Sequence, residues 1–124
     1  MVAEPTLSDL QKNVLDHAAT EPPFTGKLID NKGDGMYHCV RCGSVLFSSQ
    51  TKFDSGSGWP SFSTSNTPDS VTLHEDDSLG VHRTEVRCAK CNGHLGHVFD
   101  DGPSQQGGKR YCINSCVLDF NHSK

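Results

Sequence analysis

The chain has 124 residues, of which 33% are hydrophobic, and its 11 Lys and Arg against 15 Asp and Glu give a net charge of −4. This length predicts a single domain over residues 1–124, with residues 1–6 as a disordered tail, and the acidic balance argues against nucleic acid as a partner. No segment reaches the ~20 apolar residues that span a bilayer, and no signal-peptide pattern opens the chain, so we expect a cytoplasmic protein with no membrane partner. We also expect a monomer.

The first predicted element is an amphipathic helix that runs from a cap at Thr6 or Ser8 to about Ala19. Its apolar side chains recur at helical spacing, at Leu7, Leu10, Val14, Leu15 and Ala18. Because Pro22 and Pro23 remove backbone donors, the helix must end before them.

Short apolar or alternating runs follow, separated by clusters of Gly, Asp, Asn and Ser. Such runs predict antiparallel strands, for example at Met36–Val40, Val45–Phe47, Val71–Leu73, Val81–Val86 and Tyr111–Phe120. The polar segment Ser61–Ser70 is expected to be a loop. The pattern therefore predicts a mainly β fold with a short N-terminal helix.

Four of the six cysteines form two Cys-x-x-Cys pairs, Cys39 with Cys42 and Cys88 with Cys91. Each pair can present two thiolates from a tight turn, and four sulfur ligands make the closed tetrahedral site that structural zinc prefers. We expect one structural Zn²⁺ per chain. Two disulfides, a thioredoxin-like redox pair and a Cys₂His₂ site of Cys88, Cys91, His94 and His97 remain alternatives.

The C-terminal strand carries the other two cysteines. Alternation along one strand places four side chains on one face, those of Arg110, Cys112, Asn114 and Cys116. A guanidinium two residues before Cys112 lowers a thiol pKa, and an amide two residues after it can donate a hydrogen bond. Cys112 is therefore the predicted nucleophile, with a buried structural thiol as the alternative.

Four motifs occur in order, at Tyr37–Gly43, Asp54–Phe62, Arg87–Pro103 and Arg110–Ser115. Together they closely resemble the methionine-R-sulfoxide reductase (type B) family, from about Leu7 to Phe120. The resemblance implies two antiparallel β-sheets bearing a structural zinc. It also implies thiol-dependent reduction of methionine R-sulfoxide, protein-bound or free, in the repair of oxidised proteins.

The resemblance also implies roles for single residues. Cys112 matches the nucleophile, Trp59 the wall that receives the substrate methyl group, and Phe99 a further substrate contact. The polar site residues that match are His94, His97, Asp101, Arg110 and Asn114. A sulfoxide accepts a thiolate only as its oxygen is protonated, and histidine is the natural proton donor near neutral pH. His94 and His97 are both candidates, and Asp101 would orient one of them.

Oxygen transfer leaves Cys112 as a sulfenic acid, which must be reduced again. Many members of the family carry a resolving cysteine two residues before the Trp, where this chain has Ser57. Cys116 is a poor substitute, because four residues of extended strand separate two Cα atoms by ~13 Å and a disulfide needs ~7 Å or less. We expect thioredoxin or a small thiol to reduce Cys112 directly, and Cys116 to be a packed thiol.

Two functions without redox chemistry are the alternatives. A zinc-ribbon-like binding module would explain the four cysteines, but it predicts a basic stripe that the sequence lacks. An interaction domain that has lost its redox activity would leave Cys112 without a function.

Overall fold

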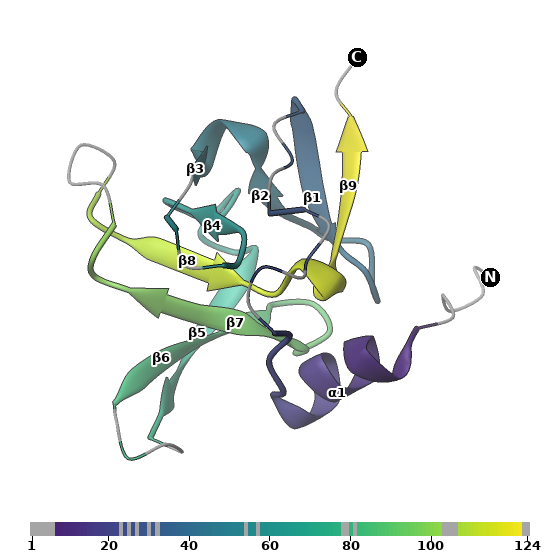
Figure 1. Cartoon of the computed structure of the whole chain (residues 1–124), viewed down its shortest axis with the longest axis vertical. Coiled ribbons are helices and arrows are strands. Elements are labelled where there is room, and N and C mark those ends of the chain that lie inside the picture. Colours follow the sequence, from purple (N-terminus) through teal and green to yellow (C-terminus); the bar gives the residue numbers. More distant parts are fainter. Residues whose placement is uncertain are drawn as a thin grey trace.

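The computed structural model describes residues 7–22, 24, 26, 28–29, 31, 33–53, 55–56, 58–77, 80, 82–102 and 107–122. The predicted tail at residues 1–6 lies outside this part. Figure 1 shows the elements, which are α1 (Asp9–His17), β1 (Gly35–Cys39), β2 (Val45–Ser48), η1 (Ser49–Thr51), β3 (Lys52–Phe53), β4 (Ser61–Phe62), β5 (Val71–Asp76), β6 (Arg83–Cys88), β7 (His94–Phe99), β8 (Arg110–Ile113), η3 (Ser115–Val117) and β9 (Leu118–His122).

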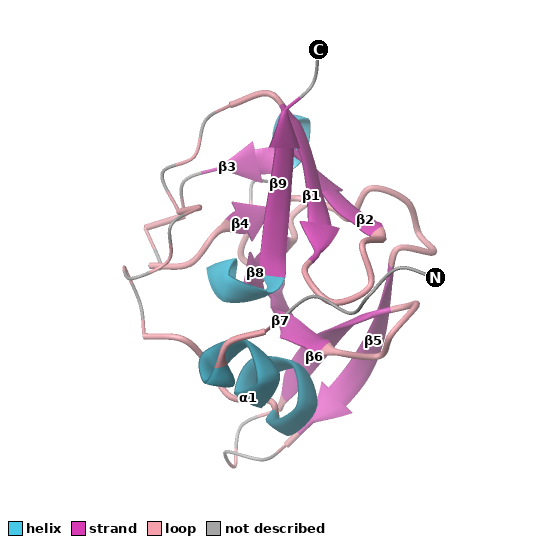
Figure 2. Ribbon diagram, turned by 90° about the vertical axis from the view of Figure 1, so that its right-hand side faces the viewer, coloured by secondary structure: helices cyan, strands magenta, loops and turns pink. Residues whose placement is uncertain are grey.

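The strands form two antiparallel sheets, one in the order β2-β1-β9 and the other in the order β3-β4-β8-β7-β6-β5. Figure 2 shows the small sheet above the β5–β7 part of the large one. The predicted fold class, mainly β with two antiparallel sheets and one short helix, is confirmed. No helix in the described part of the chain is long and apolar enough to cross a membrane.

The N-terminal helix starts at one of the two predicted caps. The Ser8 hydroxyl accepts from the Gln11 backbone N–H at 3.1 Å, and the Gln11 side chain accepts from the Ser8 N–H at 2.7 Å, which is the reciprocal pattern of a capping box. The helix ends at His17, before the prolines, because Ala18 adopts a left-handed conformation with φ of 54°. Val14 and Leu15 are its buried face.

Aromatic side chains join the two sheets. Phe62 on β4 stacks on Phe47 of β2 at 4.4 Å between ring centroids and meets Tyr37 of β1 edge-on at 5.1 Å. All three are fully buried. Aromatic pairs of this geometry contribute about 0.5–1.5 kcal/mol each beyond their buried area.

The face of the large sheet opposite this core holds different side chains. Tyr111 pairs with Phe62 on one side and Val98 on the other, so these three share the core face. Cys112, one residue along β8, pairs with Ser61 and His97. Because successive residues of a strand point to opposite faces, Cys112 and its two neighbours lie on the far side from the aromatic core.

The single strand predicted over Tyr111–Phe120 is wrong. The chain leaves the large sheet after Ile113, makes the η3 turn, and enters the small sheet as β9. Figure 1 shows this turn above α1. The turn forms because the buried carboxylate of Glu21 accepts from the backbone N–H groups of Ser115 and Cys116, which an extended strand would offer to a neighbouring strand.

Two further predicted segments differ from the structure, and one strand was not predicted. Ser61 and Phe62, at the start of the predicted polar loop, form β4. The structure has a strand at His94–Phe99 whose first five residues are buried, although two are histidines and one is glycine. The strand predicted over Val81–Val86 is observed as Arg83–Cys88, and Val81 lies outside the described residues.

Candidate functional site

The two Cys-x-x-Cys segments bring four sulfur atoms together. Cys39 and Cys88 end β1 and β6, and Cys42 and Cys91 lie in the turns that follow. Their four Sγ atoms lie within 4.8 Å of one another, and no disulfide links them. The geometry therefore favours one four-thiol metal site over the alternative of disulfides.

The two turns have the same backbone geometry. The N–H of Gly43 donates to the carbonyl of Cys39 at 2.8 Å, and the N–H of Asn92 donates to the carbonyl of Cys88 at 2.8 Å. The residue after the second cysteine has a positive φ in both turns, 77° at Gly43 and 62° at Asn92. Gly and Asn adopt this left-handed conformation with little strain, so both sequences encode the same ligand-presenting turn.

The electrostatics of the cluster suit a bound cation. A hydrogen bond from the Cys39 thiol lowers the pKa of Cys88, which favours the thiolate form that binds a metal, while the hydrogen bond with Cys88 and burial raise the pKa of Cys39. Arg41 donates to the carbonyl of Cys91 at 3.3 Å and forms an ion pair with Asp16 of α1 at 2.6 Å, which ties the helix to the cluster. Four sulfur donors without an open position match the ligand set of structural zinc.

Cys112 lies in a different setting, at the centre of the large sheet. It pairs with Ser61 on one side and His97 on the other, and it faces away from the aromatic core that the preceding residue, Tyr111, contacts. A cavity of about 220 Å³ opens over this face. Its lining residues are Thr20, Trp59, Arg83, Gly96, His97, Phe99, Arg110, Cys112 and Asn114.

The structure thus brings six of the eight predicted substrate and catalytic residues to one cavity: Trp59, His97, Phe99, Arg110, Cys112 and Asn114. Asp101 lies next to it, binding Arg110 through both carboxylate oxygens at 2.8 and 3.2 Å. The Arg110 guanidinium lies 4.4 Å from the centre of the Phe99 ring. Asp101 raises the pKa of Arg110, and the neighbouring Cys112 raises it further, so this side chain is a permanent cation beside the thiol.

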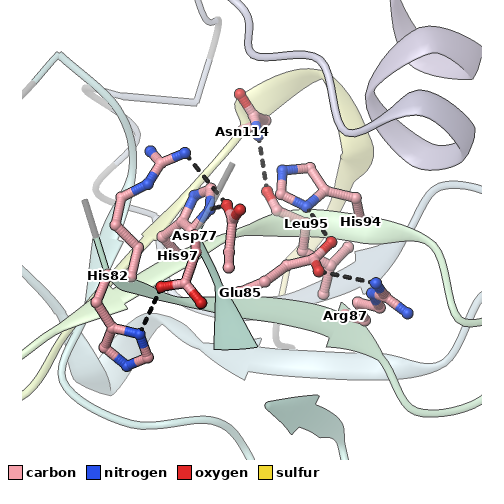
Figure 3. Close-up of polar contacts among 10 residues, drawn as sticks. Asp77, His82, Glu85, Arg87, His94, Leu95, His97 and Asn114 are labelled. Carbon is pink, nitrogen blue, oxygen red and sulfur yellow. Dashed lines mark hydrogen bonds and ion pairs between the residues drawn. The ribbon is translucent and has the colours of Figure 1, made fainter. Parts of the chain in front are cut away.

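The two histidines differ in position. His97 lines the cavity, and its Nε2 lies 2.7 Å from a carboxylate oxygen of Asp76. His94 does not line the cavity, although its ring centroid lies 5.3 Å from that of His97. Figure 3 shows the His94 ring hydrogen-bonded to Glu85, with an Nδ1–Oε2 distance of 2.7 Å.

Burial and charge fix the ionisation around His94. Burial lowers the pKa of His94 below its usual value, although Glu85 opposes this shift. Burial alone would raise the pKa of Glu85, but hydrogen bonds from Arg87 and His94 outweigh it and hold that pKa low. Because the Glu85 carboxylate can only accept, Nδ1 carries the proton of the neutral His94 ring. Its buried Nε2 has no hydrogen-bond partner among the described residues.

Several of these residues are absent from the sequence-based interpretation. Thr20, Arg83 and Gly96 line the cavity, and Asp76 and Glu85, not Asp101, hold the histidines. One signal was available for Glu85, an acidic residue within a predicted strand and between two arginines. Asp76 and Thr20 carry no comparable local signal.

Asn114 uses its side chain within the protein. Its Nδ2 donates to the carbonyl of Leu95 at 2.9 Å, and its Oδ1 accepts from the backbone N–H of Glu21 at 3.0 Å. Figure 3 shows the first of these contacts. Asn114 therefore fixes the end of β8 against β7 and the segment after α1.

Comparisons with known proteins identify the class to which this fold and site belong. Residues 7–122 match the model of the SelR domain. A peptide methionine sulfoxide reductase MsrB from Photorhabdus laumondii is 58% identical over 114 residues, which cover 92% of this chain and 83% of that protein. The enzymes of the same name from Shigella dysenteriae and Escherichia coli K12 are 55% and 54% identical, each with 92% of this chain and 82% of the relative covered.

The chain therefore belongs to the MsrB family of peptide methionine sulfoxide reductases, which are oxidoreductases. A solved structure of the Mis18 "Yippee-like" domain is also similar, with a TM-score of 0.58 and 17% identity over 73% of this chain and 98% of that one. At this identity the likeness concerns the fold alone.

Proposed function

We propose that this protein reduces the R epimer of methionine sulfoxide, with Cys112 as the nucleophile. The observation that carries the proposal is the position of Cys112 in the floor of a cavity that Trp59, His97 and Arg110 also line. Arg110 stabilises the thiolate, and the indole of Trp59 offers an apolar wall to the substrate methyl group.

His97 is the proposed proton donor, because it lines the cavity and His94 does not. Asp76 orients its ring, and Asp101 holds Arg110 beside the thiol. The Cys112 thiolate attacks the sulfoxide sulfur as His97 protonates the oxygen. The S–O bond and the new S–S bond then break as the hydroxyl passes to the Cys112 sulfur, so methionine leaves reduced by two electrons and Cys112 becomes a sulfenic acid.

Recycling requires an outside thiol in this proposal. Ser57 holds no thiol and lies outside the described residues. Cys116 lies in η3 and lines a different cavity, between α1 and β9, and burial together with the Glu21 carboxylate raises its pKa to about 12. Thioredoxin or a small thiol would supply two electrons, releasing water and a disulfide of the reductant. Protein repair is the corresponding physiological role.

The metal in this proposal is one structural Zn²⁺, held by Cys39, Cys42, Cys88 and Cys91. It supplies cross-linking of the two turns and no catalytic chemistry, because four protein ligands leave no position for water.

Turnover of the separated R and S epimers with dithiothreitol tests the proposal. We expect reduction of the R epimer, little or none of the S epimer, and a dimedone adduct on Cys112 after one turnover without reductant. Equal rates on both epimers, or full activity of Cys112→Ser, would overturn the assignment. No turnover of either epimer would favour the binding-module alternative.

A further inference from the structure

Glu21 is a buried acidic residue outside the proposed catalytic set. The residue is 2% exposed. One carboxylate oxygen accepts from the N–H of Ser115 at 2.6 Å, and the other accepts from the N–H of Cys116 at 3.0 Å. A buried carboxylate with two backbone donors is held firmly, because charge-assisted hydrogen bonds are short and about twice as strong as neutral ones.

The main chain of the same residue contacts two walls of the cavity. The backbone N–H of Glu21 donates to Oδ1 of Asn114 at 3.0 Å. Its carbonyl accepts from the indole Nε1 of Trp59 at 2.9 Å. Thr20, the preceding residue, lines the cavity itself. One residue therefore connects the wall at Trp59 with the end of the strand that carries Cys112.

These contacts divide into an anchor and a pair of arms. The carboxylate is the anchor, because it binds η3, which directly follows the strand of Cys112. The N–H and the carbonyl are the arms. A substitution at Glu21 keeps the backbone N–H and carbonyl but removes the carboxylate that fixes where they lie. Such a variant therefore tests the placement of Trp59 and Asn114 without removing their hydrogen-bond partners.

We propose that Glu21 is a positioning residue, which holds Trp59 and Asn114 in place relative to Cys112. It thereby shapes the part of the cavity that Trp59 lines, which we call the substrate slot. The inference rests on the proposed function, in which Trp59 receives the substrate methyl group. Glu21 touches no reacting atom and acts only through the two residues that its main chain holds.

Glu21→Gln tests the proposal, with Glu75→Gln as the matched control on the exposed part of β5. Trp59 is the only tryptophan of the chain, so fluorescence excited at wavelengths that its two tyrosines do not absorb reports on Trp59 alone. In Glu21→Gln, we expect acrylamide to quench Trp59 about twofold more strongly, since the loss of a charge-assisted anchor loosens the wall. The control should match the wild type.

Kinetics give the second measurement. We expect the KM for a peptide methionine R-sulfoxide to rise about tenfold, which corresponds to the loss of one charge-assisted contact. The rate of Cys112 alkylation by iodoacetamide should stay within about twofold, because Arg110 is untouched. A residue that only stabilised the fold would lower the Tm and leave the quenching and the KM of the folded enzyme unchanged.

Unchanged quenching and unchanged KM in a folded Glu21→Gln variant would overturn the proposal. If that variant does not fold, Glu21→Asp decides, because it keeps the charge but shortens the anchor by one methylene, so the backbone N–H and carbonyl must move relative to η3. Quenching and KM must then both rise. If the wild type reduces neither epimer, the proposed function fails, while the quenching experiment still tests the role of Glu21 in holding Trp59.

Discussion

The four-cysteine cluster and the Cys112 cavity place cysteine side chains in two different surroundings. In the cluster, each sulfur has other sulfurs as neighbours, at 3.5 Å for Cys42 and Cys88 and 3.7 Å for Cys39 and Cys91. At the cavity, Cys112 has a guanidinium, an imidazole and open space around it. The surroundings therefore suit the cluster thiols to metal binding and the Cys112 thiol to the proposed reaction with a substrate.

The difference also separates stability from chemistry. The cluster links the turns after β1 and β6, which belong to different sheets, and leaves no position open for a substrate. The cavity is formed by one face of the large sheet and the segments after α1 and before β4. Substitutions in the two regions should therefore affect different measurements.

The largest effect should come from the cluster. Cys42→Ser or Cys91→Ser should lose the metal and the folded state, because structural zinc supplies about 10–16 kcal/mol of apparent binding energy against a domain stability of about 5–15 kcal/mol. Metal analysis and a circular-dichroism melt measure both outcomes, with Cys116→Ser as the control. A folded wild type with less than about half an equivalent of zinc would contradict the zinc assignment.

The next effect should be confined to turnover. Cys112→Ser should lower R-sulfoxide turnover by at least about 10³-fold, since a hydroxyl at neutral pH is a far weaker nucleophile than a thiolate. Its Tm and zinc content should equal those of the wild type. A variant that lost zinc together with activity would show that the two regions are not separable.

Gly96→Ala probes the packing of β7 on β8. An added Cβ would lie 2.0 Å from the carbonyl oxygen of Cys112, so β8 must shift. We expect a loss of about 1–3 kcal/mol and a decrease in turnover of up to about 100-fold, because the nucleophile moves.

Gly80→Ala is the control for this substitution. Its φ is +72° and no contact within 4 Å of the added Cβ is found in the described part of the chain, so it introduces backbone strain without a clash. Equal turnover of the two glycine variants would show that the position of Cys112 is not sensitive to β7.

The smallest effect is predicted for Cys116. With a pKa of about 12, its thiolate fraction at pH 8 is on the order of 10⁻⁴, so iodoacetamide should label Cys112 in the native protein and leave Cys116 unlabelled. Cys116→Ser should keep turnover within about twofold with either thioredoxin or dithiothreitol. A Cys112–Cys116 disulfide after one turnover, found by mass spectrometry, would refute this expectation.

The parts of this molecule that depend on local sequence could be predicted. Ser8 and Gln11 define the helix cap within three residues, and each Cys-x-x-Cys turn is complete within five. The interruption of the C-terminal strand after Ile113 could not be predicted, because the Glu21 carboxylate that causes it lies 94 residues from Ser115 in the sequence. Alternation alone extended that strand to Phe120, and the distance argument for Cys116 used the same straight strand.

The partners of the histidines were unpredictable for a related reason. Asp76 and Glu85 reach His97 and His94 across strands, so their roles depend on the pairing of β5, β6 and β7. A bulge between Val86 and Arg87 shifts that register. The two histidines lie three residues apart in the sequence, so regular alternation would place them on opposite faces of β7. The bulge brings both rings to one face, with centroids 5.3 Å apart, and only His97 lines the cavity.

The spacing of the two Cys-x-x-Cys turns has a consequence for the unfolded chain. The 45 residues between Cys42 and Cys88 include Trp59, which lines the cavity, and Ser61, which pairs with Cys112. If the metal stays bound while the chain unfolds, this segment becomes a closed loop that has lost conformational entropy, worth about 4 kcal/mol for a cross-link of this span. The metal would then favour refolding of the segment that carries Trp59, because it lowers the conformational entropy of the unfolded chain.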